Sequence, residues 1–215
     1  MTPLFLDNHL LVLDKPWGLL TQPSGTREPS LEAQGKEFLK EHFAKPGAVF
    51  LEAVHRIDRV VGGVVLFART SKALERLNAA QREKKITKIY RARVCGIPKK
   101  SPGVLEDYLT HDDFHARVVQ PGTPEARLCR LTYDVLETAE KTALLEIHLE
   151  TGRYHQIRAQ LAHAGLPICG DTKYGAPQDA NDYAPRNGIA LISWEIAFPH
   201  PVTKDIIRID SNLRV

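Results

Sequence analysis

The chain has 215 residues, of which 43% are hydrophobic, and a formal net charge of +3. This length allows one sizeable domain with a hydrophobic core, and so mild a charge does not by itself indicate a dedicated nucleic-acid protein. The first residues have acids and a proline inside their apolar part, and no apolar run could span a bilayer, which disfavours a secretory signal and a membrane span. We therefore expect a cytoplasmic protein.

The N-terminal third predicts a strand, a loop and a helix. Residues 10–13 form a β-type run that ends at Lys15-Pro16, and the loop PWGLLTQPSGTREPS follows. The segment SLEAQGKEFLKEHF begins with a capping Ser30 and has apolar residues at helical spacing. A buried strand, VVLFA at 64–68, then precedes the helix SKALERLNAAQR, for which Ser71 is the expected cap.

The rest of the chain is richer in strands. ITKIYRARVCG alternates, with Tyr90 in mid-strand, and ALLEIHLE is another alternating strand. After a TGR turn, YHQIRAQLAHAG predicts a helix that has His155 and Arg158 on one face and Gly165 as its C-cap. Because residues 85–150 lack regular alternation of strands and helices, the predicted fold class is α+β. No domain boundary is visible, so we expect a single domain over 1–215.

Cysteines and histidines give no cofactor or metal signal. Cys95, Cys129 and Cys169 lack the paired spacing of a zinc or redox site, so we interpret them as reduced, mostly buried thiols. The motif HDDFH, residues 111–115, has two histidines four apart but no convincing third ligand, and we predict no metal there. There is also no Gly-rich phosphate loop or dinucleotide fingerprint.

The motif HRIDRVVGG, residues 55–63, places the carboxylate of Asp58 beside two arginines and a histidine. The simplest interpretation is a structural ion pair that fixes a loop. A second polar cluster, TGRYHQIR, stands where a strand becomes a helix, and two such clusters at strand ends suggest a shared cleft. An arginine beside Asp58 would keep it ionised, as a nucleophile or electrostatic stabiliser. The second carboxyl that glycoside hydrolases use is not obvious nearby.

The segment QREKKITKIYRAR surrounds Tyr90 with lysines and arginines. Cations combined with a stacking ring suit single-stranded or flipped nucleotides. Alone, such a charge run is more often a solvated face.

Four segments, in order, resemble the motifs of the RluA family of pseudouridine synthases, which isomerise uridine within structured RNA. They are LLVLDKPWGLLTQPSG, VHRIDRVVGGVVLFARTSKA, ITKIYRARVCG and LETGRYHQIRAQLAHAGLPICGDTKYG, and the tail ALISWEIAFPHP is similar to the family's closing strand. The second segment departs from the usual HRLDxxTSGxxLxA, because Ile57 replaces Leu and Val61-Gly62 replace Thr-Ser. Gln160 replaces a frequent His after HQIR. The two missing hydroxyls bear on loop rigidity or substrate choice.

The resemblance implies a mixed, largely antiparallel central sheet flanked by helices, the pseudouridine synthase catalytic-domain fold. Many family members carry a small N-terminal RNA-binding module, and we expect none here because the motifs begin almost at Met1. It also implies that Asp58 is the catalytic aspartate, that Tyr90 lies against the target uracil, and that Arg158 pairs with the Asp58 carboxylate. Arg56 resembles the arginine that helps to extrude the target base. The other residues expected to bind the substrate RNA are His55, Arg59, Lys15, Lys88, Arg153, His155 and Gln156.

The expected reaction is therefore the isomerisation of uridine to pseudouridine in a tRNA or rRNA stem-loop, with base flipping and without a cofactor. We expect the protein to act as a monomer. Two alternatives stay open. One is a catalytically silent RNA-binding protein on the same scaffold, and the other is a small-molecule nucleoside or sugar hydrolase, which the missing second carboxyl disfavours.

Overall fold

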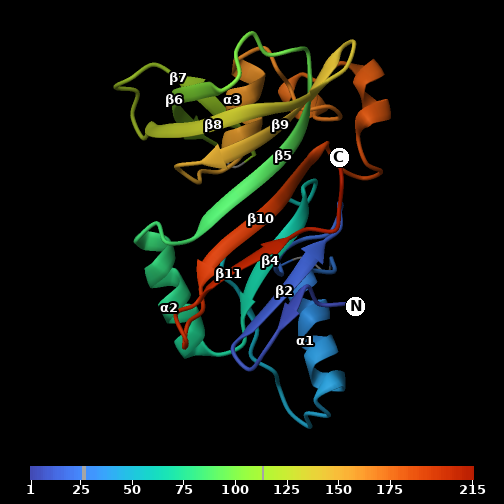
Figure 1. The fold of residues 1–215 in the computed structure, drawn as a ribbon, viewed down its shortest axis with the longest axis vertical. Coiled ribbons are helices and arrows are strands. Elements are labelled where there is room, and N and C mark those ends of the chain that lie inside the picture. Colours follow the sequence, from blue (N-terminus) through green and yellow to red (C-terminus); the bar gives the residue numbers. More distant parts are fainter. Residues whose placement is uncertain (26–27, 113) are drawn as a thin grey trace. The chain divides into compact units, whose positions relative to one another are not determined.

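The computed structural model describes residues 1–25, 28–112 and 114–215 (Figure 1). The chain forms two compact units, the first made of residues 1–88 and 192–214 and the second of residues 89–191 with the last residue. The predicted loop PWGLLTQPSGTREPS and the motif HDDFH each contain residues outside the described ranges, namely 26–27 and 113. Whether the chain is a single domain, as expected from the sequence, stays a prediction.

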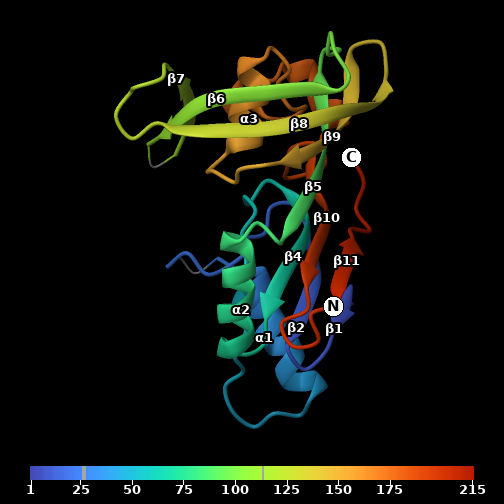
Figure 2. The ribbon, with the colours of Figure 1, turned by 60° about the vertical axis from the view of Figure 1, so that its left-hand side comes forward.

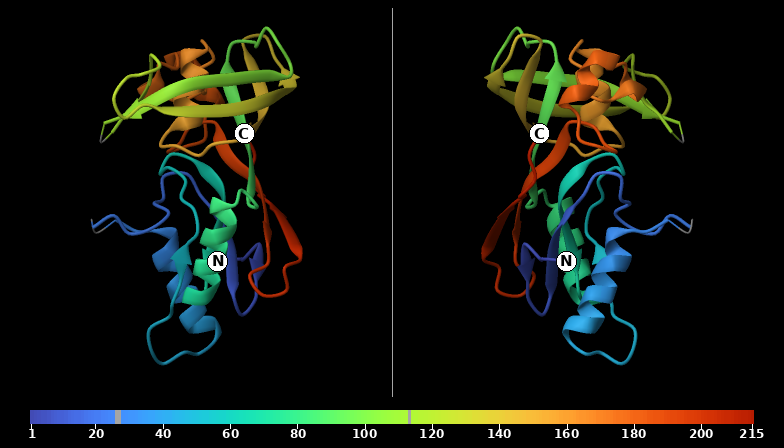
Figure 3. Two further views of the ribbon diagram at one scale, coloured as in Figure 1. Left: turned by 90° about the vertical axis from the view of Figure 1, so that its left-hand side faces the viewer. Right: turned by 90° about the vertical axis from the view of Figure 1, so that its right-hand side faces the viewer.

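The first unit is built on a mixed sheet. Its strands are β1 (Phe5–Leu6), β2 (Leu10–Lys15), β3 (Glu52–Ala53), β4 (Gly62–Ala68), β10 (Leu191–Pro199) and β11 (Ile206–Asp210). β2 pairs antiparallel with β1 and β4, and β4 also pairs antiparallel with β3. β10 pairs parallel with β4 at Gly62 and Gly63 and forms an antiparallel hairpin with β11, drawn in red in Figure 3.

Two helices cover the sheet of the first unit, α1 (Leu31–His42) and α2 (Ser71–Arg82). A Cβ atom at Gly35 of α1 would meet Leu11 and Leu13 of β2, whereas Leu10 and Val12 share a core cluster with α2. Neighbouring strand residues point to opposite faces, so β2 is buried on both sides. This explains why the run LLVL reads as continuously apolar.

The helix starts follow the predicted capping chemistry, with one correction. The Ser30 side chain accepts a hydrogen bond from the backbone N–H of Ala33, as expected. The prediction of Ser71 as the cap of α2 was wrong, because the extended residue is Thr70, whose hydroxyl accepts from Ala73. Either residue type can cap a helix, and the backbone conformation decides which one does.

The second unit is built on an antiparallel sheet. Its strands are β5 (Thr87–Cys95), β6 (Gly103–His111), β7 (Ala116–Val119), β8 (Arg127–Thr138) and β9 (Thr142–Leu149), in the order β5-β9-β8-β6-β7. β6 and β8 run side by side along most of their length (Figure 2). The helix α3 (Gln156–His163) packs on β6 and β7, and two short 3₁₀ helices follow, η1 (Thr172–Tyr174) and η2 (Gln178–Tyr183). The α+β class with a mixed, largely antiparallel sheet is confirmed.

Two of the three cysteines meet inside the second unit. An isolated bridge between Val94 and Ile168 brings the Sγ atoms of Cys95 and Cys169 to 3.4 Å. All three thiols are unoxidised, and Cys129 and Cys169 are buried, as expected. The contact was not foreseen, because the two residues are 74 positions apart in the sequence.

Candidate active site

Asp58 lies in a loop that runs into β4 and is fixed by the loop after β2. The Thr21 hydroxyl donates to the Ile57 carbonyl (2.8 Å) and accepts from the Ile57 N–H (3.3 Å). On the other side of Asp58, the Arg59 carbonyl accepts from the N–H of Gly18 (2.8 Å). Hydrogen bonds to both neighbours therefore hold the backbone of Asp58, which is itself half-buried.

Lys15 supplies the third link between these loops. Its ammonium donates to the carbonyls of Pro16 (3.1 Å), Leu19 (2.8 Å) and Arg59 (3.1 Å), and the residue is fully buried. Burial lowers the pKa of Lys15 to about 7, while the negative charge of Asp58 opposes this shift. Three carbonyls use the three N–H groups of an ammonium. The geometry thus gives Lys15 a positioning role, and its predicted contact with RNA stays a prediction.

The other cations of the motif differ in exposure. Arg56 is exposed, as a residue that reaches RNA should be. Arg59 pairs with Glu28 (2.6 Å) and donates through Nε to the carbonyl of Gly18 (3.0 Å). His55 is buried, and its Nε2 accepts from the N–H of Leu66 (3.3 Å). Burial, and next the charge of Lys88, lower the pKa of His55 well below its usual value, so the ring is neutral and supports the loop.

Packing explains why glycine replaces serine at position 62. A Cβ atom there would lie 2.8 Å from the indole of Trp17 and 3.1 Å from Leu213. The Trp17 ring occupies the space that a serine side chain would need. Position 61 is a buried valine. The missing hydroxyls are therefore replaced by apolar packing beside the Asp58 loop.

Strand β5 carries the predicted tyrosine. Tyr90 is buried and lies opposite Ile147 of β9, and Ala92 and Val94 are buried on the same face. The predicted alternation is confirmed. Lys88 is half-buried on that face, and burial lowers its pKa.

The turn between β9 and α3 is held by a glutamine. The Gln156 side chain is buried, and its Oε1 accepts from the Thr151 hydroxyl (2.9 Å) and the Arg153 N–H (3.1 Å). Its Nε2 donates to the carbonyl of Arg130 (3.2 Å) and to Gln160 (2.9 Å). These four bonds make Gln156 the internal support of the turn, and its predicted contact with RNA stays a prediction. Arg153 is exposed.

Arg158 is buried against Asp171 in a two-pronged ion pair. Its Nε lies 2.6 Å from Oδ2 and its Nη2 lies 2.8 Å from Oδ1 of Asp171. Its Nη1 contacts Nε2 of His155 at 3.0 Å, and its guanidinium lies 4.9 Å from the ring centre of Tyr174. These contacts hold the guanidinium against Asp171, His155 and Tyr174.

His155 is a neutral link in the same network. A guanidinium can only donate, so Nε2 of His155 must accept and the proton sits on Nδ1, which then donates to the Tyr174 hydroxyl at 2.9 Å. Burial, and next the charge of Arg158, lower the pKa of His155 to about 3. The residue has a left-handed backbone (φ 50°), which turns the chain into α3.

Two members of this network, Asp171 and Tyr174, were not predicted from the sequence. The signal was present, because both stand in the quoted segment GDTKYG, which resembles a family motif. The N-terminal turn of η1 folds this segment back toward α3. The predicted pair between Arg158 and Asp58 stays a prediction, since the two residues belong to different units.

Neither a metal centre nor a membrane helix is found in the described ranges. Their His, Cys, Asp and Glu side chains form no group of three or more that could hold a metal ion. Within the same ranges, no helix is long and apolar enough to cross a membrane.

Comparison with known proteins decides the family. The profile of the family described as RNA pseudouridylate synthase matches residues 9–163, which include every site residue predicted from the sequence. The chain belongs to this family. The resemblance to its RluA branch is confirmed by relatives that carry the names of ribosomal large subunit pseudouridine synthases.

Two relatives and one solved structure show the extent of the similarity. Ribosomal large subunit pseudouridine synthase C of Vibrio vulnificus is 33% identical over 212 residues, which are 97% of this chain and 64% of that protein. Ribosomal large subunit pseudouridine synthase D of Nitrosomonas europaea is 33% identical over 220 residues, 98% of this chain and 61% of that protein. The chain thus spans less than two thirds of either relative. The structure of human RNA Pseudouridylate Synthase Domain Containing 4 shares the pseudouridylate synthase fold, with a TM-score of 0.80 at 22% identity, over 98% of this chain and 88% of that one.

Proposed function

We propose that this protein isomerises uridine to pseudouridine at a specific site in structured RNA, with Asp58 as the catalytic carboxylate. The observation that carries the proposal is the fixed position of Asp58 in a chain of this family. Lys15, Thr21 and Gly18 hold the backbone on both sides of Asp58, so the segment that carries the carboxylate is fixed before any RNA binds. Such preorganisation is what a reaction at a sugar carbon requires.

The proposed reaction needs one carboxylate and no redox partner. The bond between C1′ of the ribose and N1 of uracil breaks, the base turns, and C1′ joins C5. The hydrogen on C5 leaves to solvent, and N1 takes up a proton. Asp58 acts in its ionised form at the sugar or the base, and Tyr90 assists the proton step at C5.

The second unit contributes Arg158 in this proposal. The pair with Asp171 and the contact with His155 fix the guanidinium plane, and the proposed pair joins this guanidinium to the Asp58 carboxylate. A bidentate pair of this kind holds a carboxylate ionised and oriented. Exposed Arg56 and Arg153 supply contacts to the RNA.

For the substrate class, we propose ribosomal RNA. The support is that two relatives of about one-third identity over nearly the whole chain are named ribosomal large subunit pseudouridine synthases. A transfer RNA stem-loop, which the sequence left open, becomes the competing outcome of the test. Flipping the target uridine costs a few kcal/mol, which phosphate contacts and stacking offset.

The test uses RNA labelled with tritium at C5 of uridine, since pseudouridine formation releases that label to water. Ribosomal and transfer RNA from a strain lacking the protein are incubated separately with the wild type, Asp58→Asn and the control Asp205→Asn, an exposed aspartate in the turn between β10 and β11. We expect release from ribosomal RNA with the wild type and the control, and none with Asp58→Asn. Binding by all three proteins without release would instead support the catalytically silent RNA-binding alternative.

A further inference from the structure

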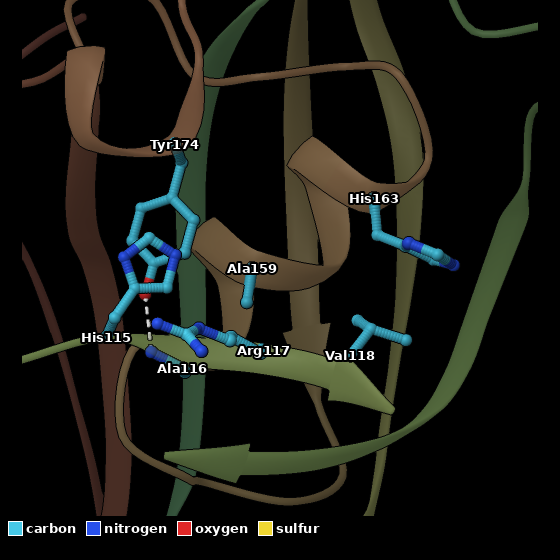
Figure 4. Close-up of a pocket in the computed structure, with 7 residues that line it drawn as sticks. All are labelled: His115, Ala116, Arg117, Val118, Ala159, His163 and Tyr174. Atoms are coloured by element: carbon cyan, nitrogen blue, oxygen red, sulfur yellow. Dashed lines mark hydrogen bonds between the residues drawn. The ribbon is translucent and has the colours of Figure 1, made fainter. Parts of the chain in front are cut away.

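A small open pocket lies between β7, α3 and η1 in the second unit (Figure 4). Its volume is about 230 Å³, and the residues that line it are His115, Ala116, Arg117, Val118, Ala159, His163 and Tyr174. In Figure 4 the rings of His115 and Tyr174 stand on one side and His163 on the other, with Ala159 between them. The proposed chemistry does not use His115, His163 or Arg117.

The lining combines an apolar floor with nitrogen donors. Ala116 and Ala159 are buried and form the floor, while Arg117 and His163 are exposed at the rim. None of the seven lining residues carries a negative charge. Pockets for drug-sized ligands have volumes of roughly 300–1,000 Å³. The volume of this pocket is smaller and suits a single planar base. This combination fits one nucleotide, with its base over the floor and its phosphate on the arginine.

The walls of the pocket are fixed in place. The Tyr174 hydroxyl accepts from the N–H of Ala116 (2.9 Å), and the ring centres of Tyr174 and His115 are 4.4 Å apart. The backbone N–H of His115 donates to Asp112 (2.7 Å), whose carboxylate also pairs with Arg117 (3.2 Å). That ion pair is exposed at both partners, so it is weak and Arg117 can exchange Asp112 for a phosphate.

A row of aromatic rings leads away from the pocket. Tyr174 meets His155 edge-on (5.6 Å), His155 stacks on Tyr154 (3.9 Å, 17°), and Tyr154 lies 5.4 Å from His111. Tyr154 is 40% exposed. A row of neighbouring aromatic rings, one of them exposed at Tyr154, with exposed arginine beside it, favours single-stranded nucleic acid over a free anion.

Tyr174 joins the pocket to the proposed active site. The face of its ring lies against the Arg158 guanidinium, and its hydroxyl binds His155, which also contacts Arg158. A nucleotide that occupies the pocket is thus separated from Arg158 by one side chain. Through Arg158, the pocket is connected to the chemistry that we propose for the second unit's guanidinium.

We propose that this pocket binds a nucleotide of the substrate RNA that flanks the reacting uridine, with its base against His115 and His163 and its phosphate on Arg117. This inference rests on the proposed function for the identity of the RNA. The pocket then acts as a specificity site, because it reads a nucleotide that takes no part in the chemistry.

The test measures RNA affinity in the Asp58→Asn background, where no turnover occurs. His163→Ala should raise the Kd about tenfold with an unchanged salt dependence, because it removes a contact to a base. Arg117→Gln should also weaken binding and reduce the slope of log affinity against log salt by about one. The controls are His42→Ala and Lys72→Gln, which remove an exposed histidine of α1 and an exposed lysine of α2.

Abasic RNAs identify the occupant. Removing the base of one flanking nucleotide should lower the RNA affinity of the protein that keeps His163 by about tenfold. The same removal should not lower the affinity of the His163→Ala protein any further, because the contact is already absent there. The inference is overturned if no flanking position couples to His163, or if millimolar inorganic phosphate alone competes as well as the RNA. Normal tritium release with unchanged affinities of the pocket variants would reject the pocket and keep the proposed function. Loss of affinity in these variants, with no tritium release by the wild type, would support the pocket and reject the proposed function.

Discussion

Arg158 and Asp171 form a buried ion pair through two parallel contacts of 2.6 and 2.8 Å. Both side chains are almost fully buried, at 6% and 1% exposure. The pair joins α3 to the turn that begins η1, so it fixes the guanidinium that we propose for the active site. Removing either side chain would leave the other charge buried without a partner, which is strongly destabilising.

Asp171→Asn should therefore damage both stability and turnover. We expect the free energy of unfolding to fall by about 3–5 kcal/mol and the melting temperature by on the order of 10 °C. Turnover, measured well below the new melting temperature, should fall as well, because the guanidinium loses its fixed plane. Glu146→Gln is the matched control, since Glu146 pairs with Arg91 in a half-exposed setting and should cost less than about 1 kcal/mol. Equal melting temperatures for the two variants would contradict the buried-pair account.

Lys15→Met tests whether the buried ammonium positions the Asp58 loop or contacts RNA. Methionine keeps much of the apolar volume but leaves the carbonyls of Pro16, Leu19 and Arg59 without their donor. We expect a loss of about 3 kcal/mol in unfolding free energy and a strong loss of turnover. The salt dependence of RNA affinity should not change, because no phosphate contact is removed. A slope that falls by about one would show that Lys15 does contact a phosphate.

The depressed pKa of His155 predicts how stability depends on pH. The folded protein holds this ring neutral with a pKa of about 3, whereas the unfolded chain binds a proton below about 6.5. Between these values the unfolded state binds more protons, so the contribution of His155 to stability falls as the pH falls from about 6.5 toward 3. The slope is at most about 1.4 kcal/mol per pH unit, and less here because the ring is only partly buried.

The measurement compares urea unfolding of the wild type and His155→Gln across that pH range. The advantage of the wild type should shrink as the solution becomes more acidic, and other titrating groups cancel in the difference. A constant difference between the two proteins would mean that His155 is protonated equally in the folded and unfolded states.

Restoring the usual family serine at position 62, beside the Asp58 loop, should destabilise the protein. Gly62→Ser places a side chain against the indole of Trp17, at a Cβ distance of 2.8 Å, and we expect a loss of about 1–3 kcal/mol. In Gly62→Ser/Trp17→Leu the smaller residue makes room, so the two changes should cost less together than the sum of the single costs. Chemical denaturation of the two single variants and the double variant measures this coupling. Strict additivity would show that the indole does not exclude serine.

Local sequence signals predicted much of this fold. The apolar run of β2, the alternation of β5 and the Ser30 cap of α1 depend on residues within a few positions of each other, so they are readable without tertiary information. The ordered motifs also indicated the family and the lone carboxylate at position 58. The cap of α2 was misplaced by one residue, because Thr70 and Ser71 have the same capping chemistry.

Which polar residues support the site, and which are exposed to a substrate, depends on how the chain folds in three dimensions. Lys15, His55 and Gln156 look like surface residues in the sequence, yet folding buries them and supplies partners from distant segments, such as the Arg59 carbonyl 44 positions after Lys15. The nucleotide-sized pocket likewise combines β7 with α3 and η1. Sequence determines which side chains are available, but burial and hydrogen bonding depend on which segments the folded chain brings together.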